Sequence, residues 1–132
     1  MIVLDTHIWI WWVSQSADLS ADKRKILALR QADGLGVSAI SCREIAKLVE
    51  KGRLSLTMPV GHWIDQALAY HGVHLLPLQP KVAVASTQLP PPFHQDPADQ
   101  IITATARELN CPLATDDAKI LAYPHVRLVG PR

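Results

Sequence analysis

Short apolar runs alternate with longer segments of mixed polarity along this 132-residue chain. The pattern predicts short buried strands that are separated by helices. The expected strands are residues 2–4, 35–39, 73–76, 113–115 and 126–129, and the expected helices are residues 6–13, 20–32, 41–51, 59–70, 80–87, 96–109 and 117–123. Strands that are apolar on both faces and linked by helices indicate an α/β domain with a parallel sheet of about five strands.

Length and composition favour one globular domain over residues 1–132. Nearly half of the residues are apolar (48%) and 19% are charged, which excludes a disordered chain. No apolar stretch reaches the roughly 18 residues of a membrane span. The N-terminus lacks the basic and then apolar pattern of a signal peptide, and two cysteines cannot form a disulfide framework. We therefore expect a reduced cytoplasmic protein that does not contact a membrane.

Six carboxylates stand where the apolar runs stop or where helices are expected to begin. They are Asp5, Glu44, Asp96, Asp99, Asp116 and Asp117. Because the carboxyl ends of parallel strands meet at one edge of a sheet, the six are expected to lie together there. Clustered carboxylates repel one another unless a cation neutralises them, and oxygen ligands suit Mg²⁺.

Helix capping is the alternative explanation for most of these acids. Ser41 and Glu44 have the spacing of a capping box, and Asp96 and Asp99 are close to one. Asp117 also stands at an expected helix start. Asp5 is the exception, because Thr6 is the expected cap of the first helix. Capping accounts for one acid at each helix start, but not for doubled acids at two starts and a further acid after the first strand.

The net charge and the remaining motifs favour some classes of function and disfavour others. Without the six carboxylates the chain carries 6 acidic and 13 basic residues, a balance of +7 that suits a polyanion approaching a metal site. The six histidines are scattered, and only His71 and His74 have a ligand-like spacing, which Gly72 interrupts. Neither a serine-hydrolase nucleophile elbow nor a glycine-rich phosphate loop is present.

Five segments, in this order, are similar to the motifs of a known family. They are residues 2–7 (IVLDTH), 38–46 (SAISCREIA), 51–54 (KGRL), 94–106 (HQDPADQIITATA) and 113–117 (LATDD). On these segments the chain resembles the PIN-domain proteins, and among them the VapC-type toxins of bacterial toxin–antitoxin pairs. Arg43 departs from the pattern, because similar chains often carry an aromatic residue there.

The resemblance implies a three-layer α/β/α PIN-like domain and a Mg²⁺- or Mn²⁺-dependent endoribonuclease. The family's catalytic and metal-binding acids fall on Asp5, Glu44, Asp99 and Asp117. The auxiliary residues of the site would be Asp96, which matches a further acid of this subgroup, Thr115, which matches a Ser/Thr position, and Asp116, which competes with Asp117 for the fourth place.

The resemblance also implies the partners: an RNA substrate, a cognate VapB-like antitoxin and a second copy of the chain in a homodimer, in the bacterial cytoplasm. The apolar run of residues 9–13 and the second helix are candidate surfaces for these protein contacts. The rival interpretation is an α/β binding or regulatory module, either a receiver-like domain or a protein that binds RNA without cleaving it. A receiver-like domain is disfavoured because Thr6 and His7 follow Asp5 where a second acid is expected.

Overall fold

The computed structural model describes residues 1–130 and has the expected α/β order. Its strands are β1 (Ile2–Leu4), β2 (Leu35–Ser38), β3 (Val73–Leu76) and β4 (Leu113–Ala114). Its helices are α1 (Thr6–Ser14), α2 (Ala21–Arg30), α3 (Ala39–Glu50), α4 (Val60–Leu68), α5 (Pro80–Ala85), α6 (Pro97–Glu108) and α7 (Ala118–Leu121), with a 3₁₀ turn, η1 (Gln31–Asp33), before β2. In residues 1–130 no helix has the length and apolar character needed to span a bilayer.

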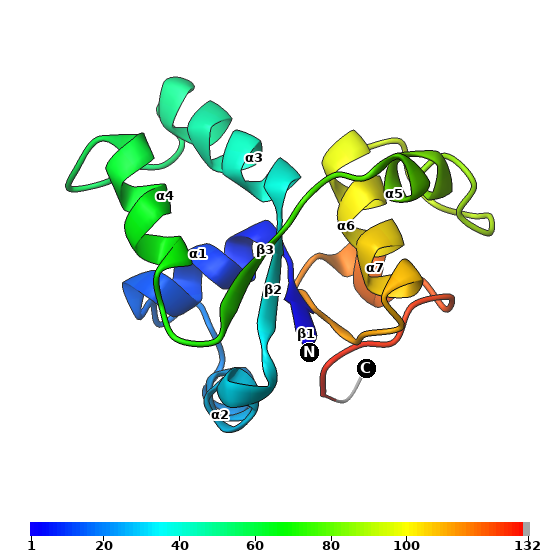
Figure 1. Cartoon of the computed structure of the whole chain (residues 1–132), viewed down its shortest axis with the longest axis horizontal. Coiled ribbons are helices and arrows are strands. Elements are labelled where there is room, and N and C mark those ends of the chain that lie inside the picture. Colours follow the sequence, from blue (N-terminus) through cyan, green and yellow to red (C-terminus); the bar gives the residue numbers. More distant parts are fainter. Residues whose placement is uncertain (131–132) are drawn as a thin grey trace.

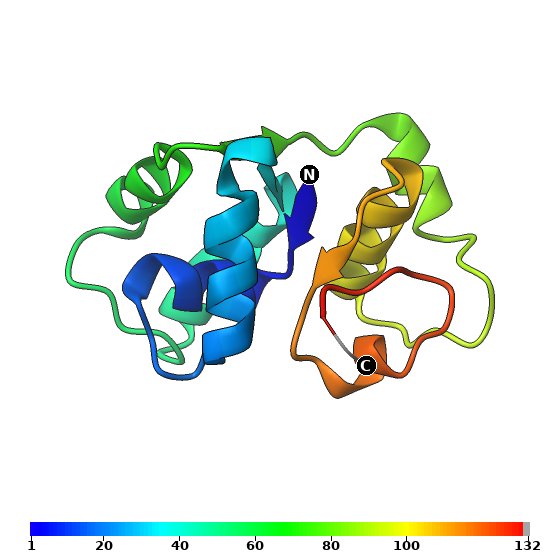
Figure 2. The same ribbon diagram turned by 90° about the horizontal axis from the view of Figure 1, so that it is seen from below.

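The sheet has four parallel strands within residues 1–130, in the order β3-β2-β1-β4. The fifth expected strand, residues 126–129, is reduced to one parallel bridge between Leu113 and Leu128. Because β4 itself is only two residues long, it offers the returning C-terminal segment a single pairing position. Figure 2 shows this segment curling back near β4. The predicted α/β class and parallel sheet are confirmed.

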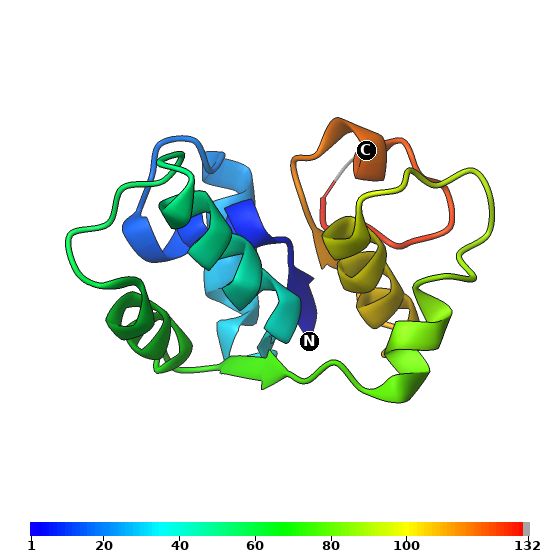
Figure 3. The same ribbon diagram turned by 90° about the horizontal axis from the view of Figure 1, so that it is seen from above.

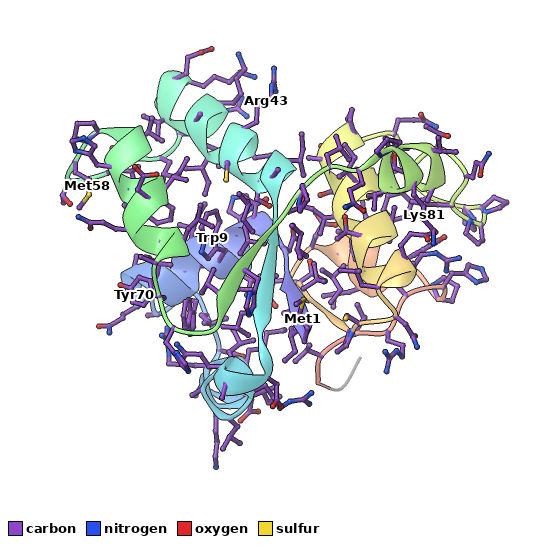
Figure 4. The ribbon with its side chains drawn as sticks, in the orientation of Figure 1. Met1, Trp9, Arg43, Met58, Tyr70 and Lys81 are labelled. Atoms are coloured by element: carbon purple, nitrogen blue, oxygen red, sulfur yellow. The ribbon has the colours of Figure 1, made fainter. Side chains whose placement is uncertain are left out.

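Alternate residues of the central strand pack on opposite sides of the sheet. Ile2 and Leu4 belong to a core with Trp9 and Trp63, whose rings meet at 5.7 Å. Val3 belongs to a second core with Ile102 of α6. Helices α1–α4 therefore lie on one side of the sheet and α5–α7 on the other, which makes three layers (Figure 1). Figure 4 shows Trp9 between α1 and α4.

Two of the expected helix caps are wrong. Helix α3 begins at Ala39 and not at Ser41, because the Ser38 hydroxyl accepts a hydrogen bond from the Ile40 amide. Ser41 is therefore inside the first turn, and no Ser41–Glu44 capping box exists. Helix α1 is capped by the Asp5 carboxylate and not by Thr6. Because no capping box forms, helix capping does not explain why an acidic residue stands at position 44.

Candidate metal centre

All six singled-out carboxylates line one pocket of about 330 Å³. Asp5 follows β1, Glu44 lies in the second turn of α3, Asp96 and Asp99 stand at the start of α6, and Asp116 and Asp117 lie between β4 and α7. The sheet therefore brings together acids that are up to 112 positions apart in the sequence. Figure 3 looks onto the molecule from above, where α3 and α6 flank β1.

Asp5 is the most buried acid of the six, with a side chain that is held from two sides. Its Oδ1 accepts a hydrogen bond from the Thr6 amide at 2.8 Å, and its Oδ2 accepts one from the Thr115 hydroxyl at 2.7 Å. Thr115 in turn accepts a hydrogen bond from the Asp117 amide at 3.0 Å. Burial raises the pKa of Asp5 above its ordinary value, and these hydrogen bonds oppose that shift.

Glu44 is held by two linked hydroxyl groups, a relay that runs from Ser41 of α3 through Thr6 of α1. The Thr6 hydroxyl lies 2.8 Å from the Ser41 hydroxyl and also contacts the Glu44 carboxylate. Since Thr6 has one hydroxyl proton, it donates to the carboxylate and accepts from Ser41. Burial raises the pKa of Glu44 to about 7, and the neighbouring charges of Asp5 and Asp99 add to the rise.

Asp99 forms a hydrogen bond with the neighbouring His94. The His94 Nε2 atom lies 2.7 Å from Asp99 Oδ2, and both side chains are largely buried. Burial raises the pKa of Asp99 to about 6, against the lowering effect of this contact with His94. Asp96 caps α6 by accepting a hydrogen bond from the Asp99 amide at 3.0 Å.

The two neighbouring acids after β4 have different partners. Asp116 forms an ion pair with Lys23 of α2 at 2.6 Å. Asp117 caps α7, and its Oδ1 atom accepts hydrogen bonds from the amides of Lys119 and Ile120.

In the part of the chain that the structure describes, one group of side chains has the compactness of a metal site. Ligand atoms of His94, Asp99 and Asp117 all lie within 4.8 Å of one another. Asp5 and Glu44 line the same pocket, with oxygens engaged by the hydroxyls of Thr115 and Thr6. The donors fit a divalent cation, because a nearby positive charge stabilises the ionised forms of Asp5, Glu44 and Asp99, whose pKa values are raised by burial.

Three residues at or beside this site, His94, His7 and Trp11, were not predicted from the sequence. His94 lies in a recognised motif, but the scattered histidines pointed to no cluster. His7 and Trp11 also line the pocket, one turn apart on α1 with ring centroids 5.8 Å apart. The spacing of His94 two residues before Asp96-Pro97, at a helix start rich in acids, is the signal that marks it in the sequence.

A second groove, of about 360 Å³, adjoins the acidic pocket and shares Glu44 and Asp96 with it. Its basic lining residues are Arg43, Lys47, Lys51 and Arg53. Lys47 forms an ion pair with Glu50 at 2.7 Å. Figure 4 shows Arg43 projecting from α3 on the side of α6. Basic side chains therefore lie directly beside the carboxylates of the acidic pocket.

Comparisons with known proteins agree with this geometry. The PIN domain family model matches residues 2–126. Ribonuclease VapC22 of Mycobacterium tuberculosis is 39% identical over 128 residues, which cover 97% of this chain and 95% of that protein. The crystal structure of VapBC2 from Rickettsia felis, bound to a DNA fragment from its promoter, has a TM-score of 0.73 at 19% identity over 98% of each chain. A toxin–antitoxin complex from Klebsiella pneumoniae has a TM-score of 0.69 at 19% identity, over 100% of this chain and 98% of that one. At such identities the solved structures show a shared fold.

Proposed function

The chain belongs to the PIN-domain family, and on that premise we propose that it is a Mg²⁺- or Mn²⁺-dependent endoribonuclease, the toxin of a toxin–antitoxin pair. The observation that carries the proposal is the pocket in which all six carboxylates meet. Ribonuclease VapC22, which is 39% identical to this chain, aligns with 97% of the chain. The reaction proposed is hydrolysis of an RNA phosphodiester bond.

Asp5, Glu44, Asp99 and Asp117 are proposed as the catalytic and metal-binding acids. A bound divalent ion supplies a Lewis acid that stabilises charge on the phosphate and lowers the pKa of a water molecule. The protein's own contribution is orientation: Thr115 holds Asp5, and the Ser41–Thr6 relay holds Glu44. Asp117 is proposed rather than Asp116 as the fourth acid, because Asp116 is engaged by Lys23. Asp96 is assigned a supporting role as the cap of α6.

The basic groove is proposed to hold the RNA backbone. Arg43 and Arg53 are exposed residues of its lining, and Glu44 lines both this groove and the acidic pocket. A phosphate chain lying along the groove therefore contacts basic side chains next to the carboxylates that the groove shares with the acidic pocket. Phosphate contacts of this kind supply affinity without depending on sequence.

The expected protein partners remain proposals. The similar solved structures are complexes of toxins with antitoxins, which supports a VapB-like antitoxin as the partner of this chain. We also propose a homodimer, a single domain over residues 1–132 and action in the bacterial cytoplasm. Of the apolar run of residues 9–13, Trp9 and Ile10 are buried in the core, which leaves the half-buried Trp11, Trp12 and Val13 for contacts with a partner.

RNA cleavage by purified protein tests the proposal. Wild-type protein and an Asp5→Asn variant are compared on the same RNA with Mg²⁺ or Mn²⁺, and Asp65→Asn is the matched control because Asp65 is exposed on α4. Asn still caps a helix, so the Asp5→Asn variant is expected to fold and to lose cleavage. Cleavage by this variant at the wild-type rate refutes the assigned site. Absence of cleavage by the wild-type protein, with RNA still bound, shows that the chain binds RNA without cleaving it.

A further inference from the structure

His94 is held beside the acidic pocket, next to Asp99, although it lies in the loop between α5 and α6. Its ring stacks on Phe93, with centroids 4.5 Å apart and an interplanar angle of 25°. Phe93 is itself packed edge-on against Tyr123 at 4.8 Å. The carbonyl of His94 accepts a hydrogen bond from the Gln100 side chain at 3.1 Å. These contacts hold the imidazole in place from the loop side and from α6.

The Nε2 atom of His94 is directed at the carboxylates. It lies 2.7 Å from Asp99 Oδ2, and with Asp117 it completes a group whose ligand atoms lie within 4.8 Å of one another. Two ligands with bonds of about 2.1 Å to one ion are separated by up to about 4.2 Å. The spread of the group is close to that limit, so small side-chain movements suffice to close it on an ion.

We propose that His94 is a nitrogen ligand of the metal, together with Asp99 and Asp117, and that it makes the site select Mn²⁺ over Mg²⁺. The inference rests on the proposed metal-dependent function and specifies the ligand set and the metal class. Mg²⁺ strongly prefers oxygen ligands, whereas imidazole suits transition metals. Replacing one oxygen donor by an imidazole nitrogen therefore weakens the binding of Mg²⁺ more than the binding of Mn²⁺.

The histidine that lines the pocket, His7, has a different environment. His7 is exposed at the first turn of α1, its ring faces Trp11, and it does not belong to the compact ligand group. His7→Gln is therefore a matched control for His94→Gln, because it removes an imidazole that lines the pocket but lies outside the ligand group.

Pulsed electron paramagnetic resonance of the Mn²⁺-loaded protein tests the inference directly. Wild type and His7→Gln are expected to show a hyperfine coupling of Mn²⁺ to histidine nitrogen, identified by ¹⁵N-histidine labelling, and His94→Gln is expected to lack it. By calorimetry, His94→Gln should weaken Mn²⁺ binding at least about tenfold and Mg²⁺ binding by less than about threefold. Circular dichroism establishes that the variants are folded.

Absence of the nitrogen coupling in the wild type overturns the inference without reference to any variant. Equal losses of Mn²⁺ and Mg²⁺ affinity in His94→Gln also overturn it, since they show that His94 only orients Asp99 through the hydrogen bond. RNA cleavage measured on the same wild-type preparation keeps the two proposals apart. Cleavage without nitrogen coupling refutes the ligand role alone, and coupling without cleavage refutes the nuclease function alone.

Discussion

Replacing Glu44 with Gln should stabilise the metal-free protein at high pH. Burial raises the pKa of Glu44 from 4.5 to about 7, so ionisation of this side chain opposes folding. A shift of this size corresponds to roughly 3 kcal/mol for a fully buried group. Because Glu44 is only partly buried, solvent screening reduces the expected gain to about 1–2 kcal/mol. Gln retains an oxygen that accepts the Thr6 hydrogen bond.

The direction of the pH dependence follows from the raised pKa. The folded state binds the proton more tightly than the unfolded chain, so the contribution of Glu44 is fully favourable below pH 4.5 and is lost as the pH rises through about 7. Wild type and Glu44→Gln should therefore have similar stability near pH 4. The variant should become progressively more stable than the wild type up to about pH 8.

Urea unfolding followed by tryptophan fluorescence, in EDTA between pH 4 and 8.5, measures this difference. Glu50→Gln is the control on the same helix, because Glu50 is exposed and its pKa is lowered by Lys47. That variant should show no gain at high pH. A Glu44→Gln variant that is no more stable than the wild type at pH 8 refutes the conclusion that the pocket disfavours the ionised carboxylate.

Three further variants test the site, the groove and the core. Thr115→Val removes the hydroxyl that holds Asp5, so Mn²⁺ affinity measured by calorimetry should fall about tenfold, and unchanged affinity contradicts the orienting role. Combined Arg43→Ala and Arg53→Ala changes, made in the Asp5→Asn background, should weaken RNA binding. The slope of the logarithm of the binding constant against the logarithm of the salt concentration should fall by about 0.7 for each lost phosphate contact with a single strand. An unchanged slope contradicts the proposal that RNA binds in this groove. Trp9→Ala should cost about 3–5 kcal/mol of unfolding free energy in a urea titration, because its side chain is fully buried against Trp63; a loss below about 1 kcal/mol contradicts this packing.

The buried strands and the common edge of the carboxylates could be predicted from the sequence because each depends on local pattern. Ile2 to Leu4 is apolar at every position, and the parallel arrangement follows from helices between the strands. The fifth strand could not be predicted in the same way. Residues 126–129 have the composition of a strand, but pairing depends on the length of β4, which ends before Thr115 turns toward Asp5.

The composition of the site was predicted less completely than its position. The Ser41–Glu44 spacing imitates a capping box, but the helix begins two residues earlier, and Glu44 is instead held by Thr6. The part played by His94 depends on how the loop before α6 packs, through contacts of its neighbour Phe93 with Tyr123, 30 positions away. Such contacts have no periodicity in the sequence.

Dependence of RNA cleavage on a divalent ion, compared between wild type and Asp99→Asn, tests the central claim most directly. Wild-type protein treated with EDTA should not cleave RNA, and added Mn²⁺ or Mg²⁺ should restore cleavage in proportion to occupancy of the site. The Asp99→Asn variant should stay inactive at metal concentrations that saturate the wild type. Cleavage that persists in EDTA, or an Asp99→Asn variant as active as the wild type, contradicts the assignment of this pocket as a metal-dependent nuclease site.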